Sequence, residues 1–189
     1  MKHSATIPSP VGVLVLEVSM DSLCKIELLP PEREMDLETS RLGKQSSPAS
    51  DPGKLPRKVV ANMHAGNSVT ADVIDQLGRY FEDPEWHFEL PLAPGGTPFQ
   101  RRVWQALQSI PSGVTMSYGV LASRLGTSAR AVGNACRRNP IPIVIPCHRV
   151  ISAHGPGGFM GSWTGRPLAI KKWLLTHETL HDRSIRKAT

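Results

Sequence analysis

The chain has 189 residues, of which 40% are hydrophobic and 20% are charged. This composition is typical of a soluble globular protein and excludes a disordered chain or a coiled coil. No apolar run is long enough to cross a bilayer and the N-terminus lacks the apolar region of a signal peptide, so we expect a soluble, intracellular protein. The three cysteines form no C-x-x-C pair, which favours a reducing compartment and argues against a disulfide framework or a finger-type zinc site.

The charges of the two halves differ sharply. Residues 1–97 hold 9 Lys or Arg against 14 Asp or Glu, a net charge of −5, whereas residues 98–189 hold 13 against 2, a net charge of +11. No acidic residue lies between Glu89 and Glu178. Such asymmetry points to a polyanionic partner for the second half. Nucleic acid is the leading candidate, although an acidic membrane surface or the acidic half itself also fits.

The first half predicts a small α/β domain over residues 1–92. Residues 5–19 and 23–29 have the pattern of two strands joined by a hairpin turn. A stretch rich in Pro, Ser and charge at residues 30–58 predicts a long surface loop. Apolar residues then recur at helical spacing over 69–81, behind Asn67 and Ser68 as candidate N-caps. WHFEL, at 86–90, predicts a third strand, and the Pro and Gly run at 91–96 marks a domain boundary.

The basic half predicts a mainly helical domain over residues 98–180, followed by a tail at 181–189. Thr97-Pro98-Phe99-Gln100 has the pattern of a capping box with proline at the first helical position, so a helix begins there. A second helix begins after Ser117 and ends at Gly126, and a third begins within two residues. Two helices across so tight a turn predict a helix-turn-helix, which commonly presents a helix to DNA.

The third helix of this half consists mostly of Ala, Gly, Ser and Asn, interrupted by Arg130, Arg137 and Arg138. Small side chains let the backbone approach a partner closely, which suits the narrow minor groove of DNA, where little sequence information is available. The alternative is a helix that packs on a neighbour through Ala131 and Ala135 while its arginines are merely solvated. The sequence leaves both interpretations open.

The run IPIVIPCHRV, at residues 141–150, has the apolar character of a buried strand but contains Cys147, His148 and Arg149. Buried ionisable groups are costly unless they are partnered. A cysteine attacks as a thiolate and needs a base, and the base needs an orienting group. His148 is adjacent, and Glu178 follows the apolar face of the last predicted helix by one turn. Alternatively, Cys147 is an inert core thiol and the other two are ordinary surface residues.

These residues closely resemble a known signature. Asn139-Pro-Ile-Pro, followed by Val144-Ile-Pro-Cys-His-Arg-Val-Ile, is similar to the active site of the O6-alkylguanine-DNA alkyltransferases. The resemblance continues through FQRRVWQAL, SYGVLA, ARAVGNACRRNP and LAIKKWLLTHE, and so covers nearly all of residues 98–178. It implies an α/β fold, with a small ribonuclease-H-like N-terminal domain followed by a mainly helical winged-helix domain.

The resemblance implies DNA repair by direct, stoichiometric transfer of an alkyl group, mainly methyl, from O6-alkylguanine to a cysteine, with O4-alkylthymine as a second substrate. The protein would act as a monomer on double-stranded DNA, without a cofactor or a membrane partner. Some members hold a structural zinc, but Cys24 with His3 or His64 makes no convincing ligand set, so we expect no metal. It would bind the minor groove independently of sequence and flip the damaged nucleotide out of the stack. It would be nuclear in a eukaryote and cytoplasmic in a prokaryote. The thioether product offers no carbonyl to water, so each molecule would react once.

The same resemblance implies the catalytic roles. Cys147 would be the nucleophile, His148 would take the thiol proton through a water, and Glu178 would orient the imidazole. Tyr118 would protonate or hydrogen-bond the leaving base. Asn139 would brace the loop, although an Asn before Pro is also a plain helix C-cap, and the two roles are compatible.

The resemblance further implies a DNA-binding surface and a base pocket. The residues implied in DNA binding and base flipping are Ala129, Arg130, Gly133, Arg137 and Tyr118; Arg130 would fill the space left by the flipped nucleotide or, alternatively, contact a phosphate. The residues implied around the base are Cys147, Val150, Trp163, Thr164 and Gly165. In that pocket the Cys147 and Val150 carbonyls would read the exocyclic amine, Trp163 would stack on the base and Thr164 would hydrogen-bond to it.

Two departures from the family pattern carry predictions. The segment from Tyr118 to Arg130 is shorter than usual by about two residues, which would shift the arginine. The loop at 152–167 is longer and carries Trp163 and Arg166, which would narrow the pocket and favour methyl over large adducts. Three rivals remain open: a non-catalytic sensor of alkylated DNA, a thiol hydrolase and a sequence-specific DNA-binding regulator. Cys147 argues against the sensor, whose relatives carry tryptophan at that position.

Overall fold

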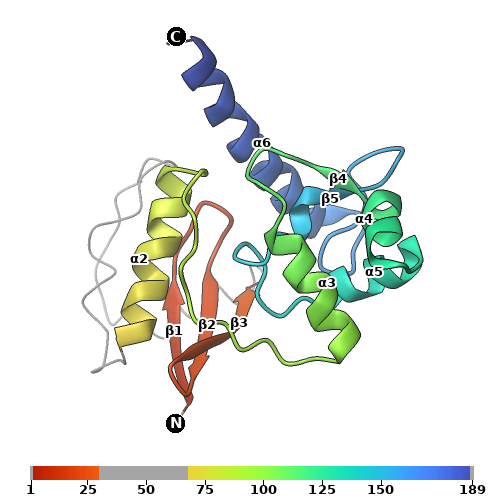
Figure 1. Ribbon diagram of the computed structural model, residues 1–189. Coiled ribbons are helices and arrows are strands. Elements are labelled where there is room, and N and C mark those ends of the chain that lie inside the picture. The colour runs from red at the N-terminus through yellow and green to blue at the C-terminus, as the bar shows by residue number, and fades with distance from the viewer. Residues whose placement is uncertain (1, 30–67, 188–189) are drawn as a thin grey trace.

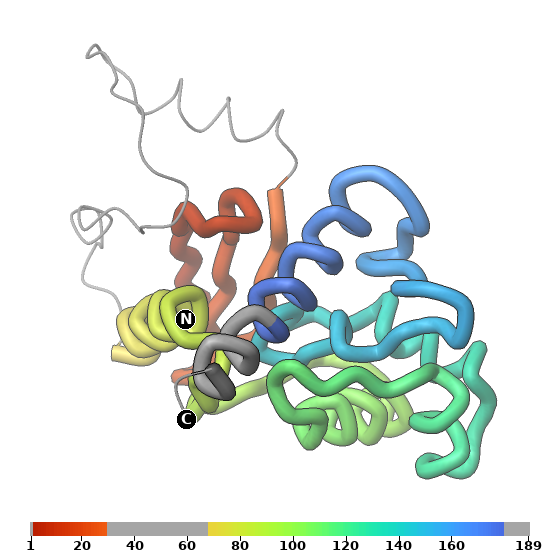
Figure 2. Tube along the Cα trace, turned by 90° about the horizontal axis from the view of Figure 1, so that it is seen from above, coloured from red at the N-terminus to blue at the C-terminus, as the bar shows by residue number. Residues whose placement is uncertain are grey.

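The computed structural model describes residues 2–29 and 68–187, which form a mixed α/β protein (Figure 1). Three strands and one helix lie on one side of the molecule, three helices lie on the other, and the last helix passes between them (Figures 1 and 2). The surface loop predicted for 30–58 and the candidate cap Asn67 lie outside the described residues. None of the described helices combines the length and apolar character that crossing a membrane would need.

The N-terminal sheet has three antiparallel strands, β1 (Lys2–Ile7), β2 (Leu14–Ser19) and β3 (Ser22–Leu28), in sequential order. The single strand predicted for 5–19 is therefore wrong, because a turn divides it. Pro8 and Pro10 have no N–H to donate to a ladder, and Gly12 adopts φ 108°, which suits glycine. The predicted hairpin turn is confirmed, since Met20 and Asp21 both have positive φ.

Helix α2 (Ser68–Glu82) packs on this sheet through an apolar face that includes Val73, Leu77 and Tyr80, all fully buried. The predicted helix is confirmed, but no strand forms over 86–90. The Gln76 side chain binds both backbone groups of Glu89, at 2.8 and 3.0 Å, and so occupies groups that a ladder would need. The chain pairs with the sheet slightly later, through a parallel bridge between Leu23 and Leu92.

Helix α3 (Pro98–Gln108) begins with the predicted capping box, in which the Thr97 and Gln100 side chains each accept from the other's backbone N–H. Its apolar face buries Val103, Trp104 and Leu107. Trp104 also donates from Nε1 to the Ala135 carbonyl at 2.9 Å, which fixes α3 against α5. The predicted start of the helical half is thus confirmed.

The two further predicted helices are α4 (Tyr118–Leu125) and α5 (Ala129–Arg137), each with a serine N-cap. Between them Gly126 adopts the left-handed conformation, with φ 62°, so the chain reverses within a few residues. Before α4, strand β4 (Met116–Ser117) pairs in parallel with β5 (Val150–Ile151). This pairing brings the start of α4 beside the end of the IPIVIPCHRV run.

The strand predicted for the whole 141–150 run is wrong. Residues 141–145 form turns, in which Ile143 has φ 76°, and a short 3-10 helix, η2 (Cys147–Arg149), follows. Three prolines at 140, 142 and 146 remove the N–H groups that a strand would need. Burial of the isoleucines was nevertheless correctly expected, because Ile141, Ile143 and Ile145 are at most 1% exposed.

Helix α6 (Gly165–Lys187) joins the two halves. Ile170 and Leu174 are buried in a hydrophobic cluster that also includes residues of β2, α2 and α3. Because this core is continuous, groups from the N-terminal half reach the surroundings of Cys147.

Candidate active site

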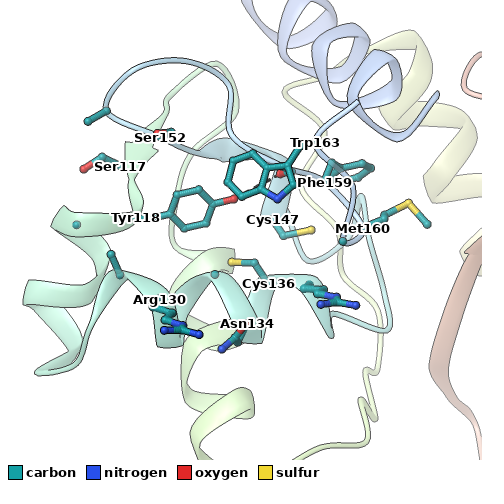
Figure 3. Close-up of a pocket in the computed structure, with 17 residues that line it drawn as sticks. Ser117, Tyr118, Arg130, Asn134, Cys136, Cys147, Ser152, Phe159, Met160 and Trp163 are labelled. Carbon is teal, nitrogen blue, oxygen red and sulfur yellow. Dashed lines mark hydrogen bonds between the residues drawn. The ribbon is translucent and has the colours of Figure 1, made fainter. Parts of the chain in front are cut away.

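A cavity of about 560 Å³ opens in the helical half beside Cys147. Its walls come from the start of α4, from α5 and from the loop between β5 and α6 (Figure 3). These are the elements that the sequence marked for DNA and base binding, and the β4–β5 pairing and the α4–α5 turn bring them together. Cys147 contributes a sulfur to this cavity, and Cys136 contributes a second one (Figure 3).

The Cys147 thiol is held by Asn139. The Asn139 side chain donates to the Cys147 sulfur at 3.1 Å and to the Ile145 carbonyl at 2.8 Å, and accepts from the Ile141 N–H at 3.0 Å. Arg138, not Asn139, occupies the C-cap of α5, so the asparagine braces the turns that carry the cysteine. Burial raises the pKa of the Cys147 thiol, and the hydrogen bond from Asn139 and the charge of Lys171 oppose that rise.

His148 and Glu178 form a buried pair. The histidine Nε2 lies 2.8 Å from Glu178 Oε1, and both side chains are almost inaccessible to solvent. A carboxylate only accepts hydrogen bonds, so Nε2 carries the proton and Nδ1 is the basic nitrogen. Nδ1 has no hydrogen-bond partner among the described residues. Burial lowers the pKa of His148 despite the opposing effect of Glu178, and the neutral imidazole is therefore favoured.

Glu178 receives hydrogen bonds from several elements. Arg149 donates to both carboxylate oxygens, Tyr80 donates to Oε1 at 2.9 Å, and the Gly113 N–H donates to Oε2 at 3.3 Å. Burial by itself would raise the pKa of Glu178, but His148 and Arg149 outweigh it and hold the pKa at about 2. The carboxylate is therefore ionised at neutral pH and fixed in orientation.

Lys171 is a site residue that the sequence analysis missed. Its side chain is fully buried, and Nζ donates to the carbonyls of Val150 at 2.6 Å and Gly158 at 3.1 Å. Burial lowers its pKa to about 8. A signal existed, because Lys171, Leu174 and Glu178 are spaced by three and four residues and so share the inward face of α6. A lysine on that face required a partner.

Tyr118 begins α4, lines the cavity and donates to the Gly158 carbonyl at 3.4 Å. Burial raises the pKa of its phenol, and the neighbouring thiols add to that rise, so the group keeps its proton near neutral pH. A proton donor is thus available at the cavity wall.

The loop after β5 departs most from expectation. Trp163 lines the cavity but is 70% exposed, and Phe159 and Met160, which the sequence analysis did not select, line it as well. Thr164 and Gly165 are exposed and are not among the lining residues. Val150 is also outside the lining, because it lies in the buried β5 strand.

Arg166 does not narrow the cavity, which corrects the sequence expectation. Its guanidinium donates to the Val11 carbonyl in the N-terminal half at 3.4 Å. The side chain belongs to a separate cleft against the turn between β1 and β2. Of the two bulky residues expected to narrow the cavity, Trp163 lines it and Arg166 does not, and Met160 lines it as well.

Helix α5 has two distinct faces. Val132 and Ala135 are buried, and the Ala135 carbonyl accepts from Trp104 of α3, as the packing interpretation required of Ala135, whereas Ala131 is only partly buried. The other face carries Ala129, Arg130, Gly133, Asn134 and Arg137, all of which line the cavity. A side chain added at Gly133 would meet no atom within 4 Å, so this face is open. The buried face agrees with the packing interpretation, and the open face has the room that a close approach to a groove would need.

Fold and site together define a class of protein in which a base-assisted thiol acts on a ligand bound beside a cationic helix. A family model described as 6-O-methylguanine DNA methyltransferase, DNA binding domain, matches residues 98–180. A methylated-DNA–protein-cysteine methyltransferase of Mycobacterium leprae is 37% identical over 188 residues, covering 96% of this chain and 100% of the relative. Another, from Salmonella typhimurium, is 41% identical over 150 residues, covering 78% and 75%. The chain belongs to the methylated-DNA–protein-cysteine methyltransferase family.

Solved structures agree with this assignment. The crystal structure of Mycobacterium tuberculosis O6-methylguanine methyltransferase has a TM-score of 0.67 and 34% identity, covering 96% of this chain and 94% of that one. A crystal structure of Mycobacterium tuberculosis OGT in complex with DNA has a TM-score of 0.66, 34% identity and coverage of 95% and 94%. The mixed α/β fold is therefore that of this family.

Proposed function

We propose that this protein repairs DNA by one irreversible transfer of an alkyl group, mainly methyl, from O6 of guanine to the Cys147 sulfur. The observation that carries the proposal is the buried His148–Glu178 pair beside a thiol that opens onto a cavity. The names of the relatives, methylated-DNA–protein-cysteine methyltransferases, support the same reaction. O4-alkylthymine is included as a second substrate, because its alkyl group is also carried on a base oxygen.

The reaction begins with loss of the thiol proton. His148 Nδ1 takes it from Cys147 through a bridging water, and Glu178 stabilises the imidazolium that results. Asn139 and the cationic Lys171 stabilise the thiolate, since both act to lower the pKa of the thiol. The neutral imidazole favoured by burial is the form that can accept a proton.

The thiolate then attacks the alkyl carbon. A sulfur–carbon bond forms, the bond from that carbon to O6 breaks, and its electron pair stays on the guanine. Tyr118, whose phenol keeps its proton, protonates or hydrogen-bonds the leaving base. The product is a thioether, which water does not hydrolyse, so one protein molecule removes one alkyl group and needs no cofactor.

The DNA contacts are assigned to the open face of α5. Small residues, including Ala129 and Gly133, let the backbone approach the minor groove, and Arg137 supplies positive charge. Arg130 fills the space left by the nucleotide that rotates into the cavity. Binding by a monomer to double-stranded DNA, independent of sequence, follows from contacts that read the backbone and the shape of the groove.

The base enters beside Trp163, which stacks on it at the cavity mouth. The Cys147 and Val150 carbonyls read its exocyclic amine; the Val150 carbonyl accepts from Lys171, but a carbonyl has a second lone pair. Thr164 and Gly165 follow Trp163 in the chain and are exposed, so they are accessible to contact the base as it enters. Because Trp163 and Met160 restrict the opening, methyl adducts are preferred over large ones.

The family resemblance and the positions of these elements also support a finer description of the architecture. In it, residues 1–92 are a ribonuclease-H-like domain, residues 98–180 are a winged-helix domain with the active site, and 181–189 are a tail. A protein that repairs chromosomal DNA acts inside the cell, in the nucleus of a eukaryote or the cytoplasm of a prokaryote.

The test is intact-protein mass spectrometry after mixing with excess duplex that contains O6-methylguanine. The wild type gains one methyl group, which maps to Cys147 and never exceeds one per molecule, whereas Cys147→Ala gains none. Lesion binding without an adduct would instead identify a damage sensor, and repeated product release would identify a hydrolase. Either result would refute the proposal.

A further inference from the structure

Tyr80 reaches the candidate active site from the other half of the chain. It lies on α2, its side chain is fully buried, and its hydroxyl donates to Glu178 Oε1 at 2.9 Å. The same oxygen accepts from His148 Nε2 at 2.8 Å. The N-terminal half thus contacts the acid that orients the candidate base, across 98 positions of sequence.

The ring of Tyr80 is fixed by its surroundings. Phe81 and Phe88 each lie 5.5 Å from it between ring centroids, and His177 lies at 5.6 Å with its plane nearly perpendicular. His177 also bonds from Nε2 to the Tyr80 carbonyl at 3.0 Å. These contacts fix the orientation of the Tyr80 ring. The position of its hydroxyl group therefore does not depend on the hydrogen bond to Glu178.

The hydroxyl is a permanent donor. Burial and the negative charge of Glu178 both raise the pKa of Tyr80 well above its usual value, so it keeps its proton across any practical assay range. Five titratable or charged side chains surround the Glu178 carboxylate and the imidazole that it binds. They are Tyr80 from α2, His148 and Arg149 from η2, and Lys171 and His177 from α6. Among them, Tyr80 is the neutral donor that shares Oε1 with the imidazole.

We propose that Tyr80 is a positioning residue for alkyl transfer, whose hydroxyl holds the Glu178 carboxylate in the orientation that Nε2 of His148 requires. The inference rests on the proposed function, because it assigns the N-terminal half a part in that reaction. It makes the α2–α6 contact part of the catalytic arrangement as well as of the fold.

The test is Tyr80→Phe, which removes the hydroxyl and keeps the packed ring. Single-turnover methyl transfer from O6-methylguanine duplex is measured from pH 5 to 9. The plateau rate constant falls roughly threefold to tenfold, the scale of the net contribution of one hydrogen bond. Without the competing donor, the carboxylate attracts the imidazolium more strongly, so the acidic limb of the profile moves to higher pH.

Val73→Ala is the matched control. Val73 is fully buried in the core on the same helix, two turns before Tyr80. This change lowers the stability of the α2 packing and leaves the pH profile where it was. A second control is a double-mutant cycle with Glu178→Gln, in which Tyr80→Phe loses most of its effect because its target has been changed.

The outcomes separate the two proposals. If the wild type gains no methyl group, the proposed function fails. If it does, and folded Tyr80→Phe reacts with the wild-type rate and profile, the role of Tyr80 is refuted. A slower Tyr80→Phe with an unmoved pH profile and full additivity with Glu178→Gln likewise refutes positioning and leaves only packing.

Discussion

Behind the Cys147 sulfur, the His148 imidazole and the Glu178 carboxylate are buried and hydrogen-bonded, whereas in front of it Trp163, Met160 and Arg130 are exposed. The two sides serve different needs. Proton transfer requires groups held at fixed distances. Burial restrains these groups, but it also removes the water that would stabilise their charges. Binding a duplex and admitting a rotated nucleotide require an accessible surface. Changes behind the sulfur should therefore alter stability and rate together, and changes in front should alter selectivity with stability unchanged.

The largest effect is expected for Glu178→Ala. It leaves Arg149 and His148 without their buried partner, so the free energy of unfolding falls by about 3–5 kcal/mol in urea titrations. Transfer slows by about a hundredfold or more, because the base loses its orientation. Glu82→Ala, which changes an exposed acid of α2, serves as control and shifts stability by at most about 0.5 kcal/mol.

The same pair predicts a pH dependence. The pKa of Glu178 is about 2 in the folded protein against an ordinary 4.5, so its contribution to stability is complete above pH 4.5 and is lost as the pH falls towards 2. The difference in unfolding free energy between wild type and Glu178→Ala should therefore narrow in acid. A constant difference from pH 7 to 3 would contradict the geometry.

A smaller effect is expected for Asn139→Ala, on the same buried side. It removes the donor to the Cys147 sulfur, leaves the Ile141 N–H without its partner and leaves the Ile145 carbonyl with the Cys147 N–H alone, costing about 2 kcal/mol of stability. The pKa of the thiol rises further, which the pH dependence of alkylation by iodoacetamide reports. For stability, the control is Asn134→Ala on the exposed face of α5, which should change little.

The smallest effect on the fold is expected for Trp163→Ala, on the open side. Unfolding free energy changes by no more than about 0.5 kcal/mol, since the side chain is 70% exposed. The ratio of transfer rates from benzyl to methyl adducts rises roughly threefold to tenfold as the mouth widens. Met20→Ala, an exposed residue of the β2–β3 hairpin, is the control. An unchanged ratio of benzyl to methyl transfer rates would show that Trp163 does not select adducts by size.

Local chemistry in the sequence determined much of this protein. The capping box at Thr97, the serine cap of α4 and the glycine that ends α4 follow from a few adjacent residues, so these helix ends were predicted. The Cys-His-Arg run and the isolated acid at Glu178 indicated the candidate catalytic residues, because each buried ionisable residue needed a partner. The resemblance supplied the roles and the choice of DNA.

Only the tertiary structure decided how distant segments meet. The Gln76 side chain, for example, took the backbone groups that a strand at 86–90 would have used. Likewise, Lys171 binding to Val150 and Tyr80 binding to Glu178 depend on how α6 and α2 pack. Local sequence fixes which groups need partners. Long-range packing selects the partners, because the separation of two residues along the sequence does not show whether their buried donors and acceptors lie within hydrogen-bonding distance in the fold.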